Sequence, residues 1–427
     1  MVSVDVEVGI LGDIAAEEVI RCVDMHTCGE PARIIYSGFP RMTGTTLLAK
    51  REQASKEYDH IRRRVILEPR GHWDMYGAVL VPETELVAAG QADMGVLFLH
   101  NAGFSKMCGH ATLALGRFLV DAPESIFPRR KELRVDAKGS TTQFNIHAPT
   151  GILKLSVPTL PNGRSDPSRP VSFVSVPCYA SGISVQIPIK FSFRWPELED
   201  RKSVKADFSY GGVFYCLVDA QELGFPEGLA HVDIAKMKFA ASLLKAAVNT
   251  NPELSPYTIP RDSSQPEPLY SVLIVDRARR PEKTERSNCH GFVAPNSEET
   301  GLCFFADGQI DRSPTGGGVA ARIALAYATG ELTLTEKRLY HSLLSKANSG
   351  SGAFTGSINE IVQPNSERSD PNSRDDTPAV KVLVEGRAFY TGTTNILVEK
   401  EDDIASSGFA FNQLESCRIG PPQEIAR

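Results

Sequence analysis

The stretch Met107-Cys108-Gly109-His110-Ala111 decides the fold, because it joins an apolar, strand-like run to an apolar helical pattern. Residues 94–99 form the run before it, and apolar residues recur after it with the period of an α-helix. A second stretch, Ser313-Pro314-Thr315-Gly316-Gly317-Gly318, lies between the apolar run 302–306 and another helical pattern. Each stretch therefore predicts a helix that begins with a thiol or hydroxyl side chain beside glycine.

A helix N-terminus presents free backbone amides and the positive end of the helix dipole. Such a site binds anions, and a carboxylate is the natural small-molecule candidate. The amides at Gly109, His110, Gly316 and Gly317 are the predicted donors. Asp311, just before the second stretch, is either a turn residue or a carboxylate that holds a cation. Anion-binding amides beside a carboxylate would suit a zwitterion such as an amino acid.

The composition is that of a globular protein with a packed core. The chain has 427 residues, of which 41% are hydrophobic and 23% charged, and its net charge of −6 argues against general binding to nucleic acid. The N-terminal residues lack the basic start of a signal peptide, and no apolar run is long enough to span a bilayer. The eight cysteines form no CxxC pair, so we expect free thiols and a cytoplasmic protein.

The chain is long enough for two domains, and its halves follow the same plan of strands, a central helix and further strands. We expect an N-terminal extension over 1–20, one domain over 21–196 and a second over 197–427. Polar insertions are predicted near 277–300 and 363–378. This plan indicates a weak internal duplication, with two similar α/β domains that face each other across the site and a last strand that crosses back.

Periodicity and turn residues predict several further elements. Residues 48–64 are predicted to form one charged helix, 133–157 a β-meander and 232–248 an amphipathic helix. Residues 380–390 are predicted to form a hairpin, followed by a final strand near 395–398.

Cys108 is the leading candidate for chemistry, although many cysteines are inert core residues. At a helix N-terminus the dipole and the free amides stabilise a thiolate, so we expect the pKa of Cys108 to fall. A thiolate can then act as a general base or as a nucleophile. His110 is either a first-turn residue with local hydrogen bonds or, together with Cys108, a metal ligand.

A metal or nucleotide cofactor is not expected. Cys108 and His110 are too few ligands for zinc, and Cys289 with His290 gives no ligand spacing. The glycines at 316 and 318 fit a loose dinucleotide fingerprint, but the four residues 311–314 separate them from the preceding strand. The fingerprint requires a tight strand-to-helix turn, so this interpretation is weak.

The two opening stretches, with Asp311-Arg312 in front of the second, resemble the two signature motifs of the proline racemase family. Supporting stretches occur in the family's order at 24–31, 68–77, 209–215 and 390–392. The resemblance runs from about Val23 to Ala410. It implies a diaminopimelate-epimerase-like fold, in which two similar domains each wrap a mixed sheet around a central helix and the active site lies in the cleft between them. It also implies a homodimer, and neither a cofactor nor a metal.

Racemases of this family carry a cysteine at both helix N-termini, one on each face of the substrate Cα, whereas this chain has Thr315 at the second position. One thiol can remove the α-proton, but a threonine hydroxyl cannot readily return a proton to the other face. We therefore expect the intermediate to lose a neighbouring hydroxyl as water: dehydration of trans-3-hydroxy-L-proline to Δ1-pyrroline-2-carboxylate by a lyase. Cys108 is the predicted base, and Thr315 is predicted to position or protonate the departing hydroxyl, directly or through water.

Three other functions stay open at this point: a proline or hydroxyproline racemase or epimerase, a nucleotide-dependent enzyme, and a racemase-like binding protein without activity. Two smaller departures from the family pattern are Cys28, where glycine is usual, and Gly317, where threonine or serine is usual. The substrate contacts implied by the resemblance are the amides of Gly109, His110, Gly316 and Gly317 for the carboxylate, and Asp311 for the ring ammonium. No membrane partner is expected.

Overall fold

The computed structural model describes residues 18–136, 138–276, 297–363, 377–399, 401–404 and 406–411. It shows a mixed α/β protein in which all nineteen strands of the described residues are joined by pairing into one large mixed sheet. Most of the extension predicted over 1–20 and of both predicted insertions lies outside the described residues, although residues 18–20 already belong to the first strand.

The strands form two runs of hydrogen-bonded neighbours. In spatial order the first run is β19 (Ala388–Val398), β1 (Glu18–Thr27), β2 (Glu30–Ser37), β3 (Gly77–Val81), β4 (Met94–His100), β7 (Thr141–Ala148), β8 (Gly151–Pro158) and β9 (Val171–Val174). The second is β10 (Tyr179–Pro188), β11 (Ser203–Tyr210), β12 (Phe214–Asp219), β13 (Ser271–Val275), β14 (Ser297–Phe305), β16 (Lys337–His341), β17 (Phe354–Val362) and β18 (Ala379–Gly386).

Three short strands pair at the margins of these runs: β5 (Gly103–Ser105) with β4, β6 (Arg134–Val135) with β7, and β15 (Gln309–Asp311) with β14. The helices are α1 (Leu47–Glu57), α2 (Asp59–Ile66), α3 (Glu85–Ala88), α4 (Gly109–Asp121), α5 (Ile234–Asn249), α6 (Gly316–Ala328) and α7 (Leu343–Ala347). Short 3-10 helices cover 128–132, 191–193, 196–198, 228–230 and 255–258.

The two runs have the same order of strand directions. From β1 to β9 the successive pairs are antiparallel, parallel, antiparallel, parallel, antiparallel and antiparallel. The pairs from β11 to β18 follow the same sequence. Helix α4 follows β5 in the first run and α6 follows β15 in the second, so each central helix occupies the same place in its run.

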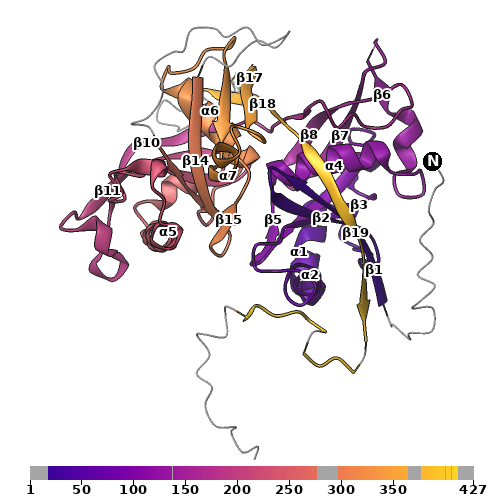
Figure 1. Cartoon of the computed structure of the whole chain (residues 1–427), viewed down its shortest axis with the longest axis horizontal. Helices are drawn as coiled ribbons and strands as arrows, with labels where there is room; N and C mark the ends of the chain where they lie inside the picture. The colour runs from indigo at the N-terminus through magenta and orange to yellow at the C-terminus, as the bar shows by residue number, and fades with distance from the viewer. Residues whose placement is uncertain are drawn as a thin grey trace, which may run out of the picture.

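Each central helix packs inside its own run of strands, with α4 among β1, β2, β8, β9 and β19, and α6 among β10, β11, β17 and β18. Figure 1 shows α4 in the purple half of the molecule and α6 in the orange half. Nearly every residue of both helices is buried, because strands surround them on several sides. A helix in such a place is apolar around its whole circumference rather than on one stripe, as these two sequences are.

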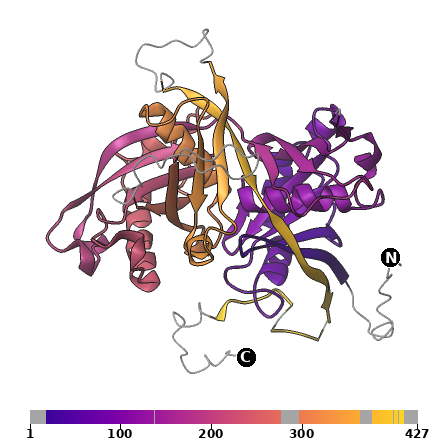
Figure 2. The same ribbon diagram turned by 45° about the horizontal axis from the view of Figure 1, so that its top comes forward.

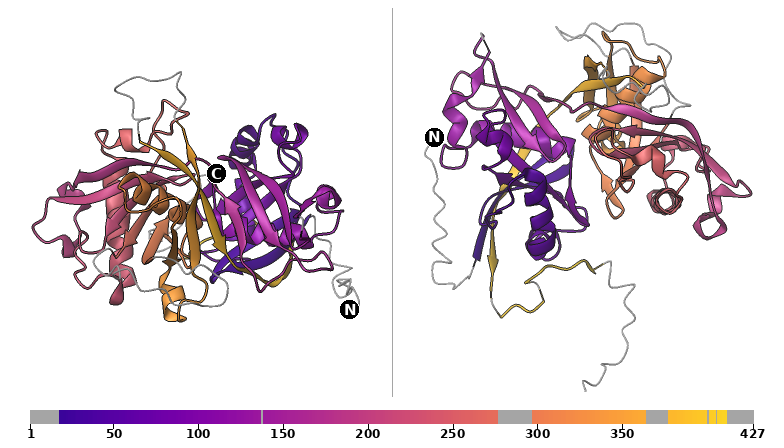
Figure 3. Two further views of the ribbon diagram at one scale, coloured as in Figure 1. Left: turned by 90° about the horizontal axis from the view of Figure 1, so that it is seen from above. Right: turned by 180° about the vertical axis from the view of Figure 1, so that it is seen from behind.

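Two long crossings connect the halves. The chain passes from β9 into β10, and it returns from β18 into β19, which pairs with β1. The two crossings run side by side, because β9 pairs with β18 and Cys178 bridges to Val380. Figure 2 shows the yellow β18–β19 ribbon running from one half to the other, and the views from above and behind in Figure 3 agree.

This crossing corrects the prediction of a hairpin over 380–390. Both edges of β18 are occupied, by β9 and by β17, and β19 instead pairs with β1. Gly386 and Arg387 therefore mark a bend between two strands and not a reversal of the chain. The helix predicted over 48–64 is also wrong in detail, since Tyr58 leaves the helical region at φ −120° and ψ 15° and separates α1 from α2.

The other predicted elements match described ones. The meander over 133–157 corresponds to β6, β7 and β8, and the amphipathic helix over 232–248 corresponds to α5. Within the described residues, no helix is long and apolar enough to cross a membrane.

Gly386 tests the packing at the crossing. A Cβ atom at this position would lie 2.7 Å from the ring of Phe354 and 2.8 Å from Leu113 of α4. We expect Gly386→Ala to lower the free energy of unfolding by about 1–3 kcal/mol, because overpacking forces the buried neighbours to move. Urea unfolding followed by circular dichroism measures the change. Gly392→Ala in β19 is the control, since its added methyl group would meet no atom within 4 Å, and an equal loss in both variants would contradict the prediction.

Candidate active site

The N-termini of α4 and α6 meet backbone to backbone. A Cβ atom on Gly109 would lie 2.4 Å from the Cα atom of Gly316, and a Cβ atom on Gly316 would lie 2.7 Å from the Cα atom of Gly109. Only glycine at both positions permits this approach. The structure thus brings together two stretches that are far apart in the sequence, with Cys108 and Thr315 each one residue before the contact.

Cys108 is the N-cap of α4. Its sulfur accepts a hydrogen bond from the amide of Ala111 at 3.4 Å and lies 3.4 Å from Nδ1 of His110. Both side chains are buried. Burial lowers the pKa of His110, so the imidazole next to the thiol is neutral at neutral pH. His110 is thus a first-turn residue with a local contact, which was one of the two interpretations open from the sequence.

The pKa of Cys108 differs from the sequence-based expectation. Burial raises it well above its usual value, and the amide of Ala111 opposes this shift while the carboxylate of Asp311 adds to it. The expectation of a lowered pKa considered only the helix N-terminus, which favours the thiolate. It did not include the removal of the thiol from water, the Asp311 carboxylate that the second half of the chain brings near, or Glu30.

Thr315 precedes α6 in an unusual conformation. Its φ of +64° is rare for a β-branched residue, and its side chain does not cap the helix. The turn before it is held by two hydrogen bonds, from the amide of Ser313 to Asp311 at 2.8 Å and from the amide of Thr315 to Oγ of Ser313 at 3.1 Å. Arg322 also donates to the carbonyl of Pro314 at 2.8 Å. Strained residues of this kind concentrate at functional sites.

The acidic side of the site combines two carboxyl groups. Asp311, at the end of β15, is buried and its Oδ2 lies 3.9 Å from Nδ1 of His110. Glu30 is fully buried, and its Oε2 accepts hydrogen bonds from the amide and the guanidinium of Arg312 at 2.8 and 3.4 Å. Burial, and next the Asp311 carboxylate, raise the pKa of Glu30 well above its usual value, while Arg312 opposes the shift. Sequence analysis assigned no role to Glu30.

Gly317, where the family pattern has threonine or serine, lies in a crowded place. A Cβ atom at this position would lie 2.5 Å from the hydroxyl oxygen of Tyr215. The first turn of α6 also approaches Gly211, whose added Cβ would lie 2.1 Å from the carbonyl oxygen of Gly317. The phenol of Tyr215 therefore occupies the space that a threonine or serine side chain would need. Cys28, the other departure, has a positive φ of 51°.

Two further groups near the site were not identified as functional from the sequence. Tyr76, which is almost fully buried, packs edge-on against the ring of His110 with 4.8 Å between ring centroids, and its hydroxyl interacts with the thiol of Cys108. Cys303 of β14 lies 2.9 Å from the hydroxyl of Ser271, and the Thr315 side chain hydrogen-bonds to it. Both contacts are long-range in sequence, so no local pattern could reveal them.

No group of three His, Cys, Asp or Glu side chains in the described part of the chain is arranged to hold a metal ion. The six cysteines that the structure describes are all free, whereas Cys289, His290 and Cys417 lie outside the described residues.

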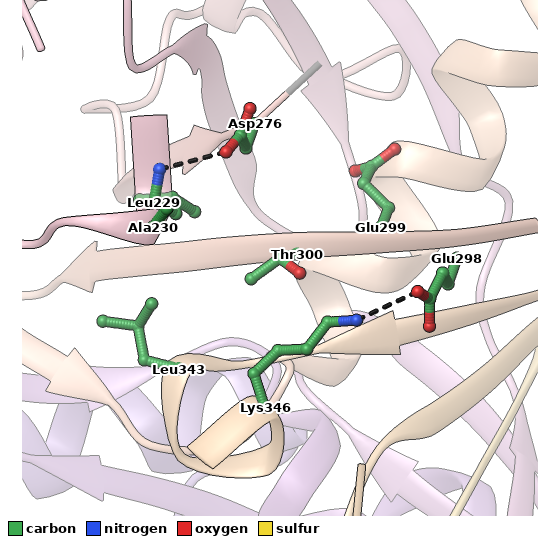
Figure 4. Close-up of a pocket in the computed structure, with 8 residues that line it drawn as sticks. All are labelled: Leu229, Ala230, Asp276, Glu298, Glu299, Thr300, Leu343 and Lys346. Atoms are coloured by element: carbon green, nitrogen blue, oxygen red, sulfur yellow. Dashed lines mark hydrogen bonds and ion pairs between the residues drawn. The ribbon is translucent and has the colours of Figure 1, made fainter. Parts of the chain in front are cut away.

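A separate pocket of about 420 Å³ lies on the C-terminal half and is lined by Leu229, Ala230, Asp276, Glu298, Glu299, Thr300, Leu343 and Lys346 (Figure 4). Its acidic side chains already have partners. Asp276 accepts a hydrogen bond from the amide of Leu229 at 3.1 Å, and Glu298 pairs with Lys346 at 3.0 Å. None of the predicted site residues lines this pocket, so we do not identify it as the active site.

The chain matches the proline racemase family over residues 22–410, and it belongs to that family. It is 39% identical to the human protein named trans-3-hydroxy-L-proline dehydratase, over 92% of this chain and 94% of the relative. A probable proline racemase from Agrobacterium radiobacter K84 has a similar fold, with a TM-score of 0.68 and 21% identity over 92% of this chain and 97% of that structure. A hydroxyproline epimerase from Agrobacterium vitis also has a similar fold, with a TM-score of 0.67 and 20% identity over 93% of this chain and 96% of that structure.

The raised pKa of Cys108 leads to a test in the protein without substrate. We expect iodoacetamide to alkylate Cys108 slowly at pH 7 and faster as the pH rises past 9.0, the usual pKa of a thiol, because only the thiolate reacts. Mass spectrometry of the peptide that contains Cys108 measures the rate, with Cys108→Ser as the blank. Rapid alkylation at pH 7 would show that the helix N-terminus outweighs burial.

Proposed function

We propose that this protein is a hydro-lyase that dehydrates trans-3-hydroxy-L-proline to Δ1-pyrroline-2-carboxylate without a cofactor. The observation that carries this proposal is the unequal pair of side chains at the two facing helix N-termini, a thiol at Cys108 and a hydroxyl at Thr315. The family match and the named function of the human relative support it.

The substrate is a zwitterion, and the site has a matching arrangement of charge. The amides of Gly109 and His110 on α4, with those of Gly316 and Gly317 on α6, are the proposed donors to the carboxylate. Two helix dipoles converge on this point, which favours a negative group there. The carboxylate of Asp311 is the proposed partner of the ring ammonium.

Cys108, as the thiolate, is the proposed base that takes the Cα proton. Burial and the negative charge of Asp311 oppose this thiolate in the protein alone. A substrate ammonium held at Asp311 would offset that charge and lower the cost of the thiolate. Thiolate formation is therefore coupled to the binding of a cationic ring. The reactive base then forms only when substrate is bound.

Because the residue at the N-terminus of α6 is Thr315 and not cysteine, we propose that the second face of the ring has no thiol beside it. The intermediate that forms when Cα loses its proton then cannot readily be reprotonated from that face. Elimination of the hydroxyl on the neighbouring carbon yields an enamine, which tautomerises to the imine product. Preorganised amides in a site closed to water strengthen every electrostatic contact in this sequence of steps.

We also propose that the two strand runs are two similar diaminopimelate-epimerase-like domains with the active site between them. The matching order of strand directions supports this division. The boundary predicted at 196–197 falls between β10 and β11, which pair with each other, so we place the passage between the domains at β9–β10. Because the site residues are buried, entry of substrate requires the domains to separate. A homodimer is proposed from the family resemblance alone.

The function is tested by incubating the purified protein with trans-3-hydroxy-L-proline and no added cofactor. We expect Δ1-pyrroline-2-carboxylate, detected with o-aminobenzaldehyde, and we expect Cys108→Ala to lose activity by about 10²-fold or more, because removal of a general base has effects of this size. L-proline and trans-4-hydroxy-L-proline serve as companion substrates, followed by chiral chromatography. Inversion of either companion without pyrroline would instead identify a racemase or epimerase.

Thr315→Cys tests the one-thiol argument. A second thiol at the N-terminus of α6 would supply a proton donor on the opposite face, so we expect the variant to racemise L-proline while the parent protein does not. Chiral chromatography of L-proline incubated in D2O measures both inversion and deuterium uptake at Cα. Thr315→Ser, which keeps the hydroxyl, is the matched control, and racemisation by the parent protein would contradict the argument.

A further inference from the structure

The proposed reaction needs a proton donor for the departing hydroxyl, and the stereochemistry of the substrate limits where that donor lies. In trans-3-hydroxy-L-proline the carboxylate and the 3-hydroxyl lie on opposite faces of the ring. The hydrogen on Cα is opposite the carboxylate, so it shares a face with the 3-hydroxyl. The base and the acid therefore approach from the same side, and an acid beside Cys108 is required. This inference rests on the proposed function.

Tyr76 lies on that side. It directly precedes β3, and its backbone carbonyl accepts a hydrogen bond from the amide of Arg33 at 2.9 Å, which fixes it to the sheet. Its ring packs edge-on against His110 and tilted against Phe305, with centroid distances of 4.8 and 5.9 Å. The ring is thus held between the first turn of α4 and the end of β14, and its exposed fraction is only 1%.

The hydroxyl of Tyr76 has unused hydrogen-bonding capacity. Among the described residues it makes no hydrogen bond of ordinary geometry, although it is fully buried. The groups that act on it are the thiol of Cys108, the phenol of Tyr270 and the hydroxyl of Ser105. Ser105 already donates its proton to the carbonyl of Met107 at 2.9 Å. A buried hydroxyl without a close partner lowers the stability of the protein unless another molecule completes its hydrogen bonding. The thiol beside this hydroxyl is the proposed base.

We propose that Tyr76 is a catalytic residue that donates the proton to the departing 3-hydroxyl. Cys108 takes the Cα proton as the thiolate, and the electron pair forms the bond between Cα and C3 while the bond between C3 and oxygen breaks. The phenol proton of Tyr76 joins the departing oxygen, which leaves as water. The Cys108 thiol then passes the proton from Cα to the Tyr76 phenolate across their contact. Both residues return to their starting states, and no proton from solvent is needed.

The electrostatics of the site agree with this role. Burial raises the pKa of Tyr76 well above its usual value, so the phenol carries its proton when substrate binds. The guanidinium of Arg51 interacts favourably with the negative charge that the phenolate carries for a moment. Arg51 donates to the carbonyl of Phe104 at 2.9 Å through its Nε atom, which holds the cation in place.

Thr315 is a poorer candidate for the same step. It precedes the facing helix, on the side of the ring from which the second thiol acts in racemases of the family. Its side chain also hydrogen-bonds to Cys303, which in turn contacts Ser271. A hydroxyl on that far side would have to act across the ring to reach a group that leaves from the Cys108 side.

The experiment compares Tyr76→Phe with Tyr36→Phe on two substrates. Tyr36 lies in β2 and packs against Phe118 of α4, so its variant makes the same chemical change against a later turn of that helix. The first substrate is trans-3-hydroxy-L-proline. The second is trans-3-fluoro-L-proline, whose fluoride is a far weaker base than hydroxide and departs without a proton. The rate of pyrroline formation gives kcat and KM for each combination of protein and substrate.

We expect Tyr76→Phe to lower kcat for the hydroxy substrate by about 10²-fold or more, the usual effect of losing a general acid. For the fluoro substrate kcat should stay within a few-fold of the parent protein, which also shows that the variant is folded and that Cys108 still removes the Cα proton. Tyr36→Phe should leave both rates unchanged.

Three results would overturn the assignment. If Tyr76→Phe is equally slow with both substrates, the phenol acts on proton abstraction and not on the leaving group. If it retains full activity with the hydroxy substrate, another group, such as the Cys108 thiol itself, supplies the proton. If the parent protein forms no pyrroline from trans-3-hydroxy-L-proline, the proposed function fails and the role of Tyr76 fails with it.

Discussion

The contact between Gly109 and Gly316 is the constraint on which the site depends. Because neither residue has a Cβ atom, the first turns of α4 and α6 approach until their backbones touch. This approach directs two sets of free amides and two positive helix ends to one point, and it places Cys108 and Thr315 on either side of it. Any larger side chain at either glycine would push the two helices apart, and their N-termini would no longer meet.

The sheet holds the two helices in this position. Each helix lies inside a run of strands, and the runs are joined where the β9–β10 and β18–β19 crossings pair side by side. The C-terminal strand β19 then completes the first run by pairing with β1. The two halves are therefore coupled through the backbone hydrogen bonds of the crossings, and Phe173 of β9 lies directly against the N-terminus of α6.

Burial determines the electrostatic state of the site. A thiol at a helix N-terminus gains from the dipole, but the removal of Cys108 from water and the nearby Asp311 raise its pKa instead. Glu30 experiences the same two effects, with Arg312 as the opposing charge. The local pattern around Cys108 predicted the correct geometry and the wrong direction of the pKa shift, because desolvation depends on every element that covers the residue and not on its own helix.

The sequence by itself determined the helix starts at Cys108 and Thr315, several of the strands and the family, because capping residues, glycines and apolar periodicity act over a few neighbouring residues. It could not determine that 380–390 is a crossing and not a hairpin, since that choice depends on which strands occupy the edges of β18. Nor could it place Glu30 against Arg312 or Tyr76 against His110. Only the tertiary structure decided these contacts, because they join residues whose separation in the sequence leaves no periodic trace.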